Sequence, residues 1–232
     1  MDAIILAAGH GKRLLPLTES IPKALVKVHG KPIIQWQIEM LDRLGIDKIY
    51  IICGYREGIL KNYFKFNIDR KVTFIHQKEQ TGTADAIYLA KNYIDNDFIV
   101  LAGDTIFLDE DIEKLMKCKN CLLLTAKYER LQEYGTVELD NNWITHIYEK
   151  FIEPKSNLVN CSAYHFKPNV FGYIPNTDVS ERFGERIITN TINLIIDDGI
   201  RFKGIKINKL LEISYPEDVE KIEEELDRRE ME

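Results

Sequence analysis

Four short apolar runs divide the first half of the chain. They are residues 3–8 (AIILAA), 48–53 (KIYIIC), 72–76 (VTFIH) and 98–103 (FIVLAG), and each contains Ile, Val or both. Continuous apolar runs bounded by turn residues are typical of strands that are buried on both faces. The runs therefore predict parallel strands in the interior of a sheet.

Helical spacing alternates with these strands. Residues 31–45 place Ile33, Trp36 and Met40 on one apolar stripe, and residues 83–94 repeat the spacing of a helix. Strands that alternate with helices favour a parallel sheet with helices packed on its faces. This half of the chain therefore predicts α/β architecture.

The pattern changes after Asp104. Further strands are predicted at residues 135–150 (two strands joined by a turn at 140–142), 159–166 and 201–207, and helices at residues 189–199 and 214–229. Strands joined by turns favour antiparallel pairing, and no linker or repeat divides the chain. We expect one domain with a Rossmann-like, three-layer α/β/α fold and a mixed, mainly parallel central sheet.

The last predicted helix has a recognisable start. Ser214 and Glu217 have the spacing of a capping box, in which two side chains satisfy backbone N–H groups at a helix N-terminus. The spacing predicts that these two residues cap the helix.

Composition excludes several classes of protein. The chain has 232 residues, of which 45% are apolar, and this is enough for a buried core. The net charge of −6 argues against nucleic acid as the main ligand, because phosphate backbones require an excess of Lys and Arg. No apolar run approaches the roughly 20 residues of a membrane-spanning helix. We expect a protein without a nucleic-acid or membrane partner.

Cysteine usage indicates the compartment. Four cysteines occur in a chain that begins without a signal segment, which predicts a cytoplasmic protein with reduced thiols. Cys118 and Cys121 form a single CxxC, without the second pair of a persuasive zinc site. The cysteines therefore do not predict a metal centre.

Residues 9–25 (GHGKRLLPLTESIPKAL) follow the first apolar run and join two glycines and two prolines to three cations. Glycines let backbone N–H groups approach phosphate oxygens closely. Arg13 supplies a planar guanidinium fork, and Lys23 supplies a point charge. The segment predicts a loop that holds phosphate.

Two common phosphate loops do not fit this segment. The dinucleotide fingerprint requires a third glycine where Leu14 stands. A P-loop requires Ser or Thr after Gly11-Lys12, where Arg13 stands.

The segment ILAAGHGKRLLPLTESIPKALVKVHGKPII resembles the signature of the sugar-phosphate nucleotidyltransferase superfamily, G-x-G-x-R followed by P-K. The likeness extends over nearly the whole chain and includes QKEQTGTADAI, VLAGD, EYGTVEL, YEK and GERIITNTINLIIDDG. It implies the nucleotide-diphospho-sugar transferase fold, with a nucleotide-binding half at 1–110 and a sugar-phosphate-binding half at 111–232. A C-terminal β-helix domain, common among relatives, is not expected.

The resemblance implies a reaction without a covalent intermediate. A sugar 1-phosphate oxygen attacks the α-phosphorus of a nucleoside triphosphate and pyrophosphate leaves, so positioning and charge neutralisation carry catalysis. It assigns catalysis to Arg13, Lys23 and Asp104. The residues that it assigns to the nucleotide are Leu6, Ala8, Gly9, Gly11, Lys12, Arg13, Gln77, Gln80, Gly82 and Thr83.

The resemblance also implies a magnesium cofactor (Mg²⁺). Asp104 ends the fourth apolar run, where open α/β sheets place ligands, and it is the first expected metal ligand. The second expected ligand is Glu212, which stands where the family has Asp or Asn. Its longer side chain is a departure that shifts the metal or places a water between them.

The second half is expected to hold the sugar phosphate. Gly135, Glu149, Lys150 and Asn160 fall where relatives bind sugar hydroxyls and phosphate. Ser162 stands where many relatives have glycine in N-x-G-x-Y, which leaves the identity of the sugar open.

The expected substrates are UTP or dTTP and a sugar 1-phosphate. An amide at Gln77 suits uracil or thymine because it offers both a donor and an acceptor. A cytidylyltransferase acting on an alcohol or polyol phosphate is the first alternative. A non-catalytic subunit that binds nucleotide sugars is the second, and a homo-oligomer is possible.

Overall fold

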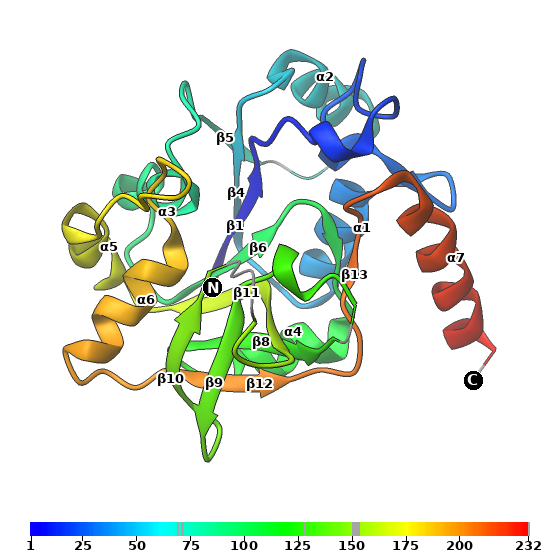
Figure 1. Ribbon diagram of the computed structural model, residues 1–232. Helices are drawn as coiled ribbons and strands as arrows, with labels where there is room; N and C mark the ends of the chain where they lie inside the picture. The colour runs from blue at the N-terminus through cyan, green and yellow to red at the C-terminus, as the bar shows by residue number, and fades with distance from the viewer. Residues whose placement is uncertain (69, 71, 128, 150–153, 232) are drawn as a thin grey trace.

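The computed structural model describes residues 1–68, 70, 72–127, 129–149 and 154–231. In this part of the chain the central sheet consists of β1 (Asp2–Ala7), β4 (Lys48–Cys53), β5 (Thr73–His76), β6 (Phe98–Ala102), β8 (Cys121–Ala126), β9 (Thr136–Asp140), β10 (Trp143–Tyr148), β11 (Leu158–Phe166) and β12 (Lys203–Lys206). Their order across the sheet is β5-β4-β1-β6-β11-β8-β12-β10-β9 (Figure 1).

The four apolar runs of the first half form β1, β4, β5 and β6, and neighbours among them pair in parallel. This confirms the prediction for the first half. In the second half β8 and β12 are parallel, but β11 is antiparallel to β6, β8 and β9, and β10 is antiparallel to β9 and β12. The sheet is therefore mixed, and parallel pairing dominates only its first half.

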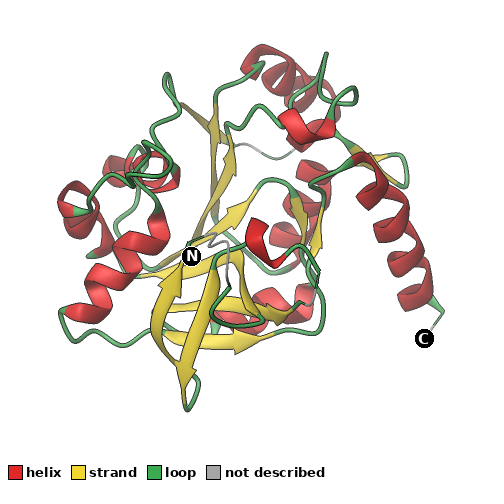
Figure 2. Ribbon diagram, in the orientation of Figure 1, coloured by secondary structure: helices red, strands yellow, loops and turns green. Residues whose placement is uncertain are grey.

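Helices pack on both faces of the sheet (Figure 2). Along β1, Ala3 and Ile5 face one core while Ile4 faces the other, because successive side chains of a strand alternate. One core includes side chains of α1 (Ile33–Arg43), α2 (Glu57–Asn67) and α4 (Asp109–Met116). The other includes those of α3 (Thr83–Tyr88), α5 (Val170–Tyr173) and α6 (Ile188–Asp197).

Three short 3₁₀ turns and two small sheets lie outside the central sheet. The turns are Lys12–Leu14, Lys23–Leu25 and Leu131–Glu133, and the small sheets are β2 (Lys27–Val28) with β3 (Lys31–Pro32) and β7 (Thr105–Ile106) with β13 (Leu211–Glu212). A third core, which includes Leu14, Val26 and Ile213, is covered by α7 (Pro216–Glu230) through Ile222. It ties α7 to the loop after β1.

Two helix predictions need correction. The helix expected over residues 83–94 ends at Tyr88, and a 3₁₀ turn follows at Lys91–Tyr93, because i→i+3 bonds such as Ala90 N–H to Ile87 O replace the α-helical ones. The expected capping box is displaced by one residue.

At the start of α7 the carboxylate of Asp218 accepts the backbone N–H groups of Ser214 (2.9 Å) and Tyr215 (2.8 Å). Glu217 is exposed. The helix begins at Pro216, so Tyr215 is the N-cap residue and the third helical position is Asp218. The prediction of Glu217 as the capping carboxylate was wrong.

The cysteines take no part in a metal site among the described residues. All four are free, and the Cys121 thiol lies 2.7 Å from the carbonyl oxygen of Cys118. No helix in the described ranges is both long enough and apolar enough to span a membrane.

Candidate active site

A cavity of about 400 Å³ opens beside the carboxyl ends of β1 and β6 and extends toward β11 and β13. Most residues that the sequence selected line it: Leu6, Ala8, Gly9, Arg13, Gln77, Gln80, Gly82, Thr83, Asp104, Gly135, Glu149, Asn160 and Glu212. Gly11, Lys12 and Lys23 do not line it directly, and Lys150 lies outside the described residues.

The loop after β1 is folded back on itself. Gly11 has a φ of 64°, and its carbonyl accepts the hydroxyl of Thr18 (2.8 Å). A Cβ atom at Gly11 would lie 3.1 Å from Cβ of Lys23, so glycine permits both the turn and this close approach. Lys12 is exposed to solvent.

Arg13 is held from three sides. Its guanidinium pairs with Glu133, donates to Ser214 Oγ (3.1 Å) and stacks over the ring of Tyr215. Ser214 Oγ in turn donates to Glu212 Oε1 (2.6 Å). The guanidinium is therefore positioned at the cavity wall by residues from the second half of the chain.

The side chains of Lys23 and Asp104 form an ion pair. Nζ of Lys23 lies 2.5 Å from Oδ2 of Asp104, although the two residues are 81 positions apart. The small sheet brings Glu212 to the same wall, because β13 pairs Glu212 with Thr105 and Ile213 N–H donates to Asp104 O (2.9 Å).

Glu212 in β13 and Asp104, directly before the paired strand β7, thus both line one cavity with carboxylates. Carboxylate and phosphate oxygens are the ligands that magnesium prefers. The donor set fits a magnesium ion.

Gln77 and Gln80 line the same cavity, and hydrogen bonds hold both side-chain amides. Gln77 is buried, and its Nε2 donates to Gly82 O (3.2 Å). Gln80 Nε2 donates to Ala8 O (2.8 Å), and its Oε1 lies 3.0 Å from His10 Nδ1. These bonds join the segment after β5 to the loop after β1.

Position 82 accepts only glycine, because there is no room for a side chain. Its φ is 117°, and a Cβ atom there would lie 2.2 Å from the carbonyl oxygen of Arg186. Arg186 is itself fixed by an ion pair with Asp85 (2.7 Å). The backbone at Gly82 is therefore placed tightly against the segment before α6.

The far end of the cavity is polar. Glu149 Oε1 accepts the hydroxyl of Thr189 (3.1 Å), and a Cβ atom at Gly135 would lie 3.1 Å from that same oxygen. Asn160 Nδ2 donates to the hydroxyl of Tyr164 (2.6 Å). Hydroxyl-bearing ligands suit such a wall of carboxylate and amide groups.

Ser162 occupies a strained bulge in β11. Its φ of 52° is a left-handed conformation that glycine adopts without cost, and its N–H donates to Asn160 Oδ1 (2.9 Å). The bulge falls where the pairing of β11 with β8 shifts register. A serine side chain is thereby placed on the cavity lining.

Several lining residues were not selected from the sequence. Glu133, Tyr134, Glu185 and Thr189 line the cavity. All four lie within or beside segments that carried the resemblance, so polar residues adjoining those motifs were the signal that could have found them. Burial, reinforced by the neighbouring Glu212 carboxylate, raises the pKa of Tyr134, which keeps its hydroxyl protonated.

Comparison with known protein families decides the assignment. The family model described as "Nucleotidyl transferase" matches residues 2–218. The chain belongs to the nucleotidyl transferase family. The resemblance seen in the loop after β1 is thus confirmed over nearly the whole sequence.

Two curated members of the nucleotidyl transferase family show the range of relatives. The UTP–glucose-1-phosphate uridylyltransferase AglF of Haloferax volcanii is 37% identical over 235 residues, covering 97% of this chain and 96% of that protein. The bifunctional protein GlmU of Methanocaldococcus jannaschii is 42% identical over 209 residues, covering 90% of this chain. The chain spans about half the length of the GlmU relatives that it matches.

Solved structures agree on the fold. A putative glucose-1-phosphate thymidylyltransferase from Bacillus anthracis, in complex with a sucrose, superposes with a TM-score of 0.84 at 25% identity, covering 97% of this chain and 94% of that one. A UDP-glucose pyrophosphorylase complexed with UDP-glucose gives a TM-score of 0.83 at 20% identity, covering 98% of each chain. The nucleotidyl transferase fold is therefore shared with both.

Proposed function

We propose that this nucleotidyl transferase condenses a nucleoside triphosphate, with UTP or dTTP preferred, with a sugar 1-phosphate to give a nucleoside diphosphate sugar and pyrophosphate. One observation carries the proposal: a single cavity gathers Arg13, Gln77, Asp104 and Glu149, with Lys23 against Asp104. The relative AglF, matched over almost its full length, is named for this kind of reaction.

In the proposed reaction an oxygen of the sugar phosphate attacks the α-phosphorus, and the bond to the pyrophosphate oxygen breaks. The ammonium group of Lys23 pairs with Asp104, which lines the cavity. In this position it is proposed to neutralise charge on the attacking phosphate and on the α-phosphate. Arg13, oriented by Glu133 and Ser214, binds the departing phosphates. No side chain is required as a nucleophile.

Asp104 and Glu212 are the proposed magnesium ligands. When bound, the ion supplies positive charge to the phosphate oxygens. The backbone contributes the geometry, since the pairing of Glu212 with Thr105 holds the segment of Glu212 next to that of Asp104.

Different residues are proposed to bind the base and the sugar phosphate. Gln77, Gln80 and the Gly82 backbone are proposed to bind the base, while Gly135, Glu149, Asn160 and Lys150 bind the sugar phosphate. Residues 1–110 thus serve the nucleotide and residues 111–232 the sugar phosphate.

A panel of nucleoside triphosphates tests the proposal. Pyrophosphate release is measured with UTP, dTTP, CTP and GTP against glucose 1-phosphate and N-acetylglucosamine 1-phosphate, and the highest kcat/KM is expected with UTP or dTTP. A strong preference for CTP with an alcohol phosphate would favour a cytidylyltransferase. Nucleotide-sugar binding with no pyrophosphate formed would favour a binding subunit.

Variants of the two cations test the mechanism. Arg13→Ala and Lys23→Ala are each expected to lower kcat/KM on the order of a hundredfold, as for loss of a charge-stabilising donor. Lys65→Ala, an exposed lysine on α2, is the matched control and is expected to retain full activity. Full activity in both Arg13→Ala and Lys23→Ala would remove this mechanism.

A further inference from the structure

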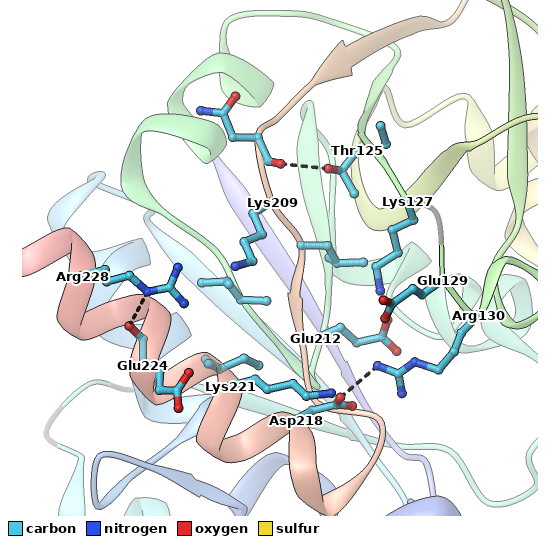
Figure 3. A pocket seen from close by; sticks show the side chains of 15 residues that line it. Thr125, Lys127, Glu129, Arg130, Lys209, Glu212, Asp218, Lys221, Glu224 and Arg228 are labelled. Atoms are coloured by element: carbon cyan, nitrogen blue, oxygen red, sulfur yellow. Dashed lines mark hydrogen bonds and ion pairs between the residues drawn. The ribbon is translucent and has the colours of Figure 1, made fainter.

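A second cavity, of about 440 Å³, lies between the end of β8, the segment before β13 and one side of α7 from Asp218 to Arg228. Five cations line it: Lys127, Arg130, Lys209, Lys221 and Arg228. Figure 3 shows these side chains arriving from three separate elements around one hollow. The proposed reaction uses none of them.

The carboxylates of this cavity are mostly engaged or at its rim. Asp218 accepts the N–H groups that start α7 and pairs with Arg130 (2.9 Å). Glu212 accepts the hydroxyl of Ser214, and Glu129 and Glu224 are exposed. Glu225 of α7 pairs with Lys209 (2.6 Å) and Arg228 (3.2 Å). Among the described residues, Lys127 and Lys221 are therefore the lining cations without a carboxylate partner.

Lys127 is the central group. It is half-buried, and burial lowers the pKa of its ammonium group. Its Nζ donates to the hydroxyl of Tyr134 (2.5 Å), and within the described residues neither Lys127 nor Lys221 forms an ion pair with a carboxylate. An ammonium group has three donors, so Lys127 has hydrogen-bonding capacity left for a ligand.

We infer that this second cavity binds a small phosphate-bearing anion and that binding there is coupled to the catalytic cavity. Lys127, Arg130 and Lys221 supply an ammonium, a guanidinium and a second ammonium, which together suit the dianionic oxygens of a phosphate group. Lys209 and Arg228 also line the cavity, and both pair with Glu225.

The coupling has a physical route. Tyr134 accepts a hydrogen bond from Lys127 and lines the catalytic cavity. Glu212 lines both cavities and accepts from Ser214, which also binds Arg13. An anion that draws Lys127 toward itself changes the hydrogen bonding of Tyr134, whose side chain lines the catalytic cavity together with Glu212.

Equilibrium binding of inorganic phosphate tests the site independently of turnover. Calorimetry on the full chain is expected to give saturable binding that Lys127→Gln and Lys221→Gln each weaken on the order of tenfold, as for loss of a charge-assisted hydrogen bond. Glu129→Gln, which removes a negative charge at the rim, is expected to tighten it. Lys65→Gln is the distant control and is expected to change nothing.

The same titration on Arg13→Ala and Lys23→Ala locates the anion. Unchanged phosphate binding in Arg13→Ala and Lys23→Ala supports binding in the second cavity. Loss of phosphate binding in these two variants, or unchanged binding in Lys221→Gln, would overturn the proposed site. Lys221 is exposed, so its variant is expected to fold, and circular dichroism checks this. Glycerol 3-phosphate in place of inorganic phosphate distinguishes a phosphate ester from the free ion, with glycerol as the blank.

Kinetics tests the coupling, which rests on the proposed function. Phosphate or glycerol 3-phosphate is expected to shift the KM for the triphosphate in the native protein and in Lys65→Gln, and not in Lys221→Gln. An equal shift in Lys221→Gln would mean competition in the catalytic cavity and would overturn the coupling. Absence of turnover with every triphosphate would refute the proposed function while the calorimetric result still decides the anion site.

Discussion

At the scale of single residues, the site depends on positions where a side chain is absent. Gly82 has both a positive φ and a carbonyl oxygen in the place of a Cβ atom. The Gln77 amide is bonded to the carbonyl of this same residue. A change at Gly82 therefore disturbs the backbone and the proposed base-binding wall together.

Gly82→Ala is expected to lower the free energy of unfolding by about 2–4 kcal/mol, because the new methyl group meets rigid backbone in a strained conformation. Urea denaturation measures the loss. Gly58→Ala is the matched control: Gly58 lies in α2, and a Cβ atom there would meet no other atom within 4 Å, so the substitution is expected to stabilise by about 0.5–1 kcal/mol. Equal effects of the two substitutions would contradict the steric account.

Some residues of the candidate site could be predicted from the sequence and others could not. Arg13, Asp104 and Gln77 could be selected because each follows a recognisable strand or loop motif. Glu133 lies in a motif that carried the resemblance, but its role could not be read there, since that role depends on a contact with Arg13 across 120 positions. Long-range partners of this kind are set by strand order, which no local pattern of residues encodes.

At the scale of elements, the start of α7 joins stability to the site. Asp218 anchors the helix and holds Arg130, while the adjoining Ser214 holds Arg13 and Glu212. Burial alone would raise the pKa of Asp218, but hydrogen bonds from Arg130 and from backbone N–H groups outweigh it and lower the pKa. The folded protein therefore binds this proton less tightly than the unfolded chain does.

Asp218→Asn is expected to cost about 1–3 kcal/mol of stability near pH 7. The stabilisation by Asp218 is present above the pKa of an unfolded aspartate, about 3.9, and is lost as pH falls through the lower pKa of the folded state. The difference between native and variant in urea denaturation should therefore shrink in strong acid. Glu217→Gln, one residue away and exposed, is expected to change stability by less than about 0.5 kcal/mol.

Element prediction succeeded where periodicity was strong. β1, β4, β5 and β6 fall within a residue or two of their apolar runs, and the turn between β9 and β10 was expected. The helix α2 and the strand β8 were not predicted. The capping box was misplaced because Ser-x-x-Glu and Tyr-x-x-Asp overlap in the sequence, and only the exact position of Pro216 in the helix separates them.

At the scale of the whole molecule, both halves of the chain contribute residues to one cavity. The cavity takes residues from the end of β1 through to β13, and its proposed metal ligands, Asp104 and Glu212, come from different halves. Ligand binding is therefore expected to stabilise the fold as a unit.

UTP with magnesium at 100 times its dissociation constant is expected to add about 2.7 kcal/mol to the free energy of unfolding, seen as a higher Tm by calorimetry. A chelator should remove most of this shift, because Asp104 and Glu212 then face the phosphates without a neutralising cation. A shift that the chelator leaves unchanged would contradict the proposed metal site. Uridine, which lacks phosphate, serves as the blank.

The family and its α/β class could be inferred from sequence, but the balance of the sheet could not. Parallel runs dominate the first half, and the mixed second half depends on β11 entering between β6 and β8. Apolar alternation in residues 159–166 predicts a strand and gives no indication of its neighbours. Which strands pair is a property of the complete chain.

The place of β11 also bears on synthesis. β6 ends at Ala102, yet the strand that covers its outer edge extends to Phe166. While the ribosome adds the roughly sixty residues between them, the emerging β6 exposes a row of unpaired backbone donors and acceptors that invites association with other nascent chains. Chaperone demand should accordingly peak in that interval of translation and fall once β11 has emerged.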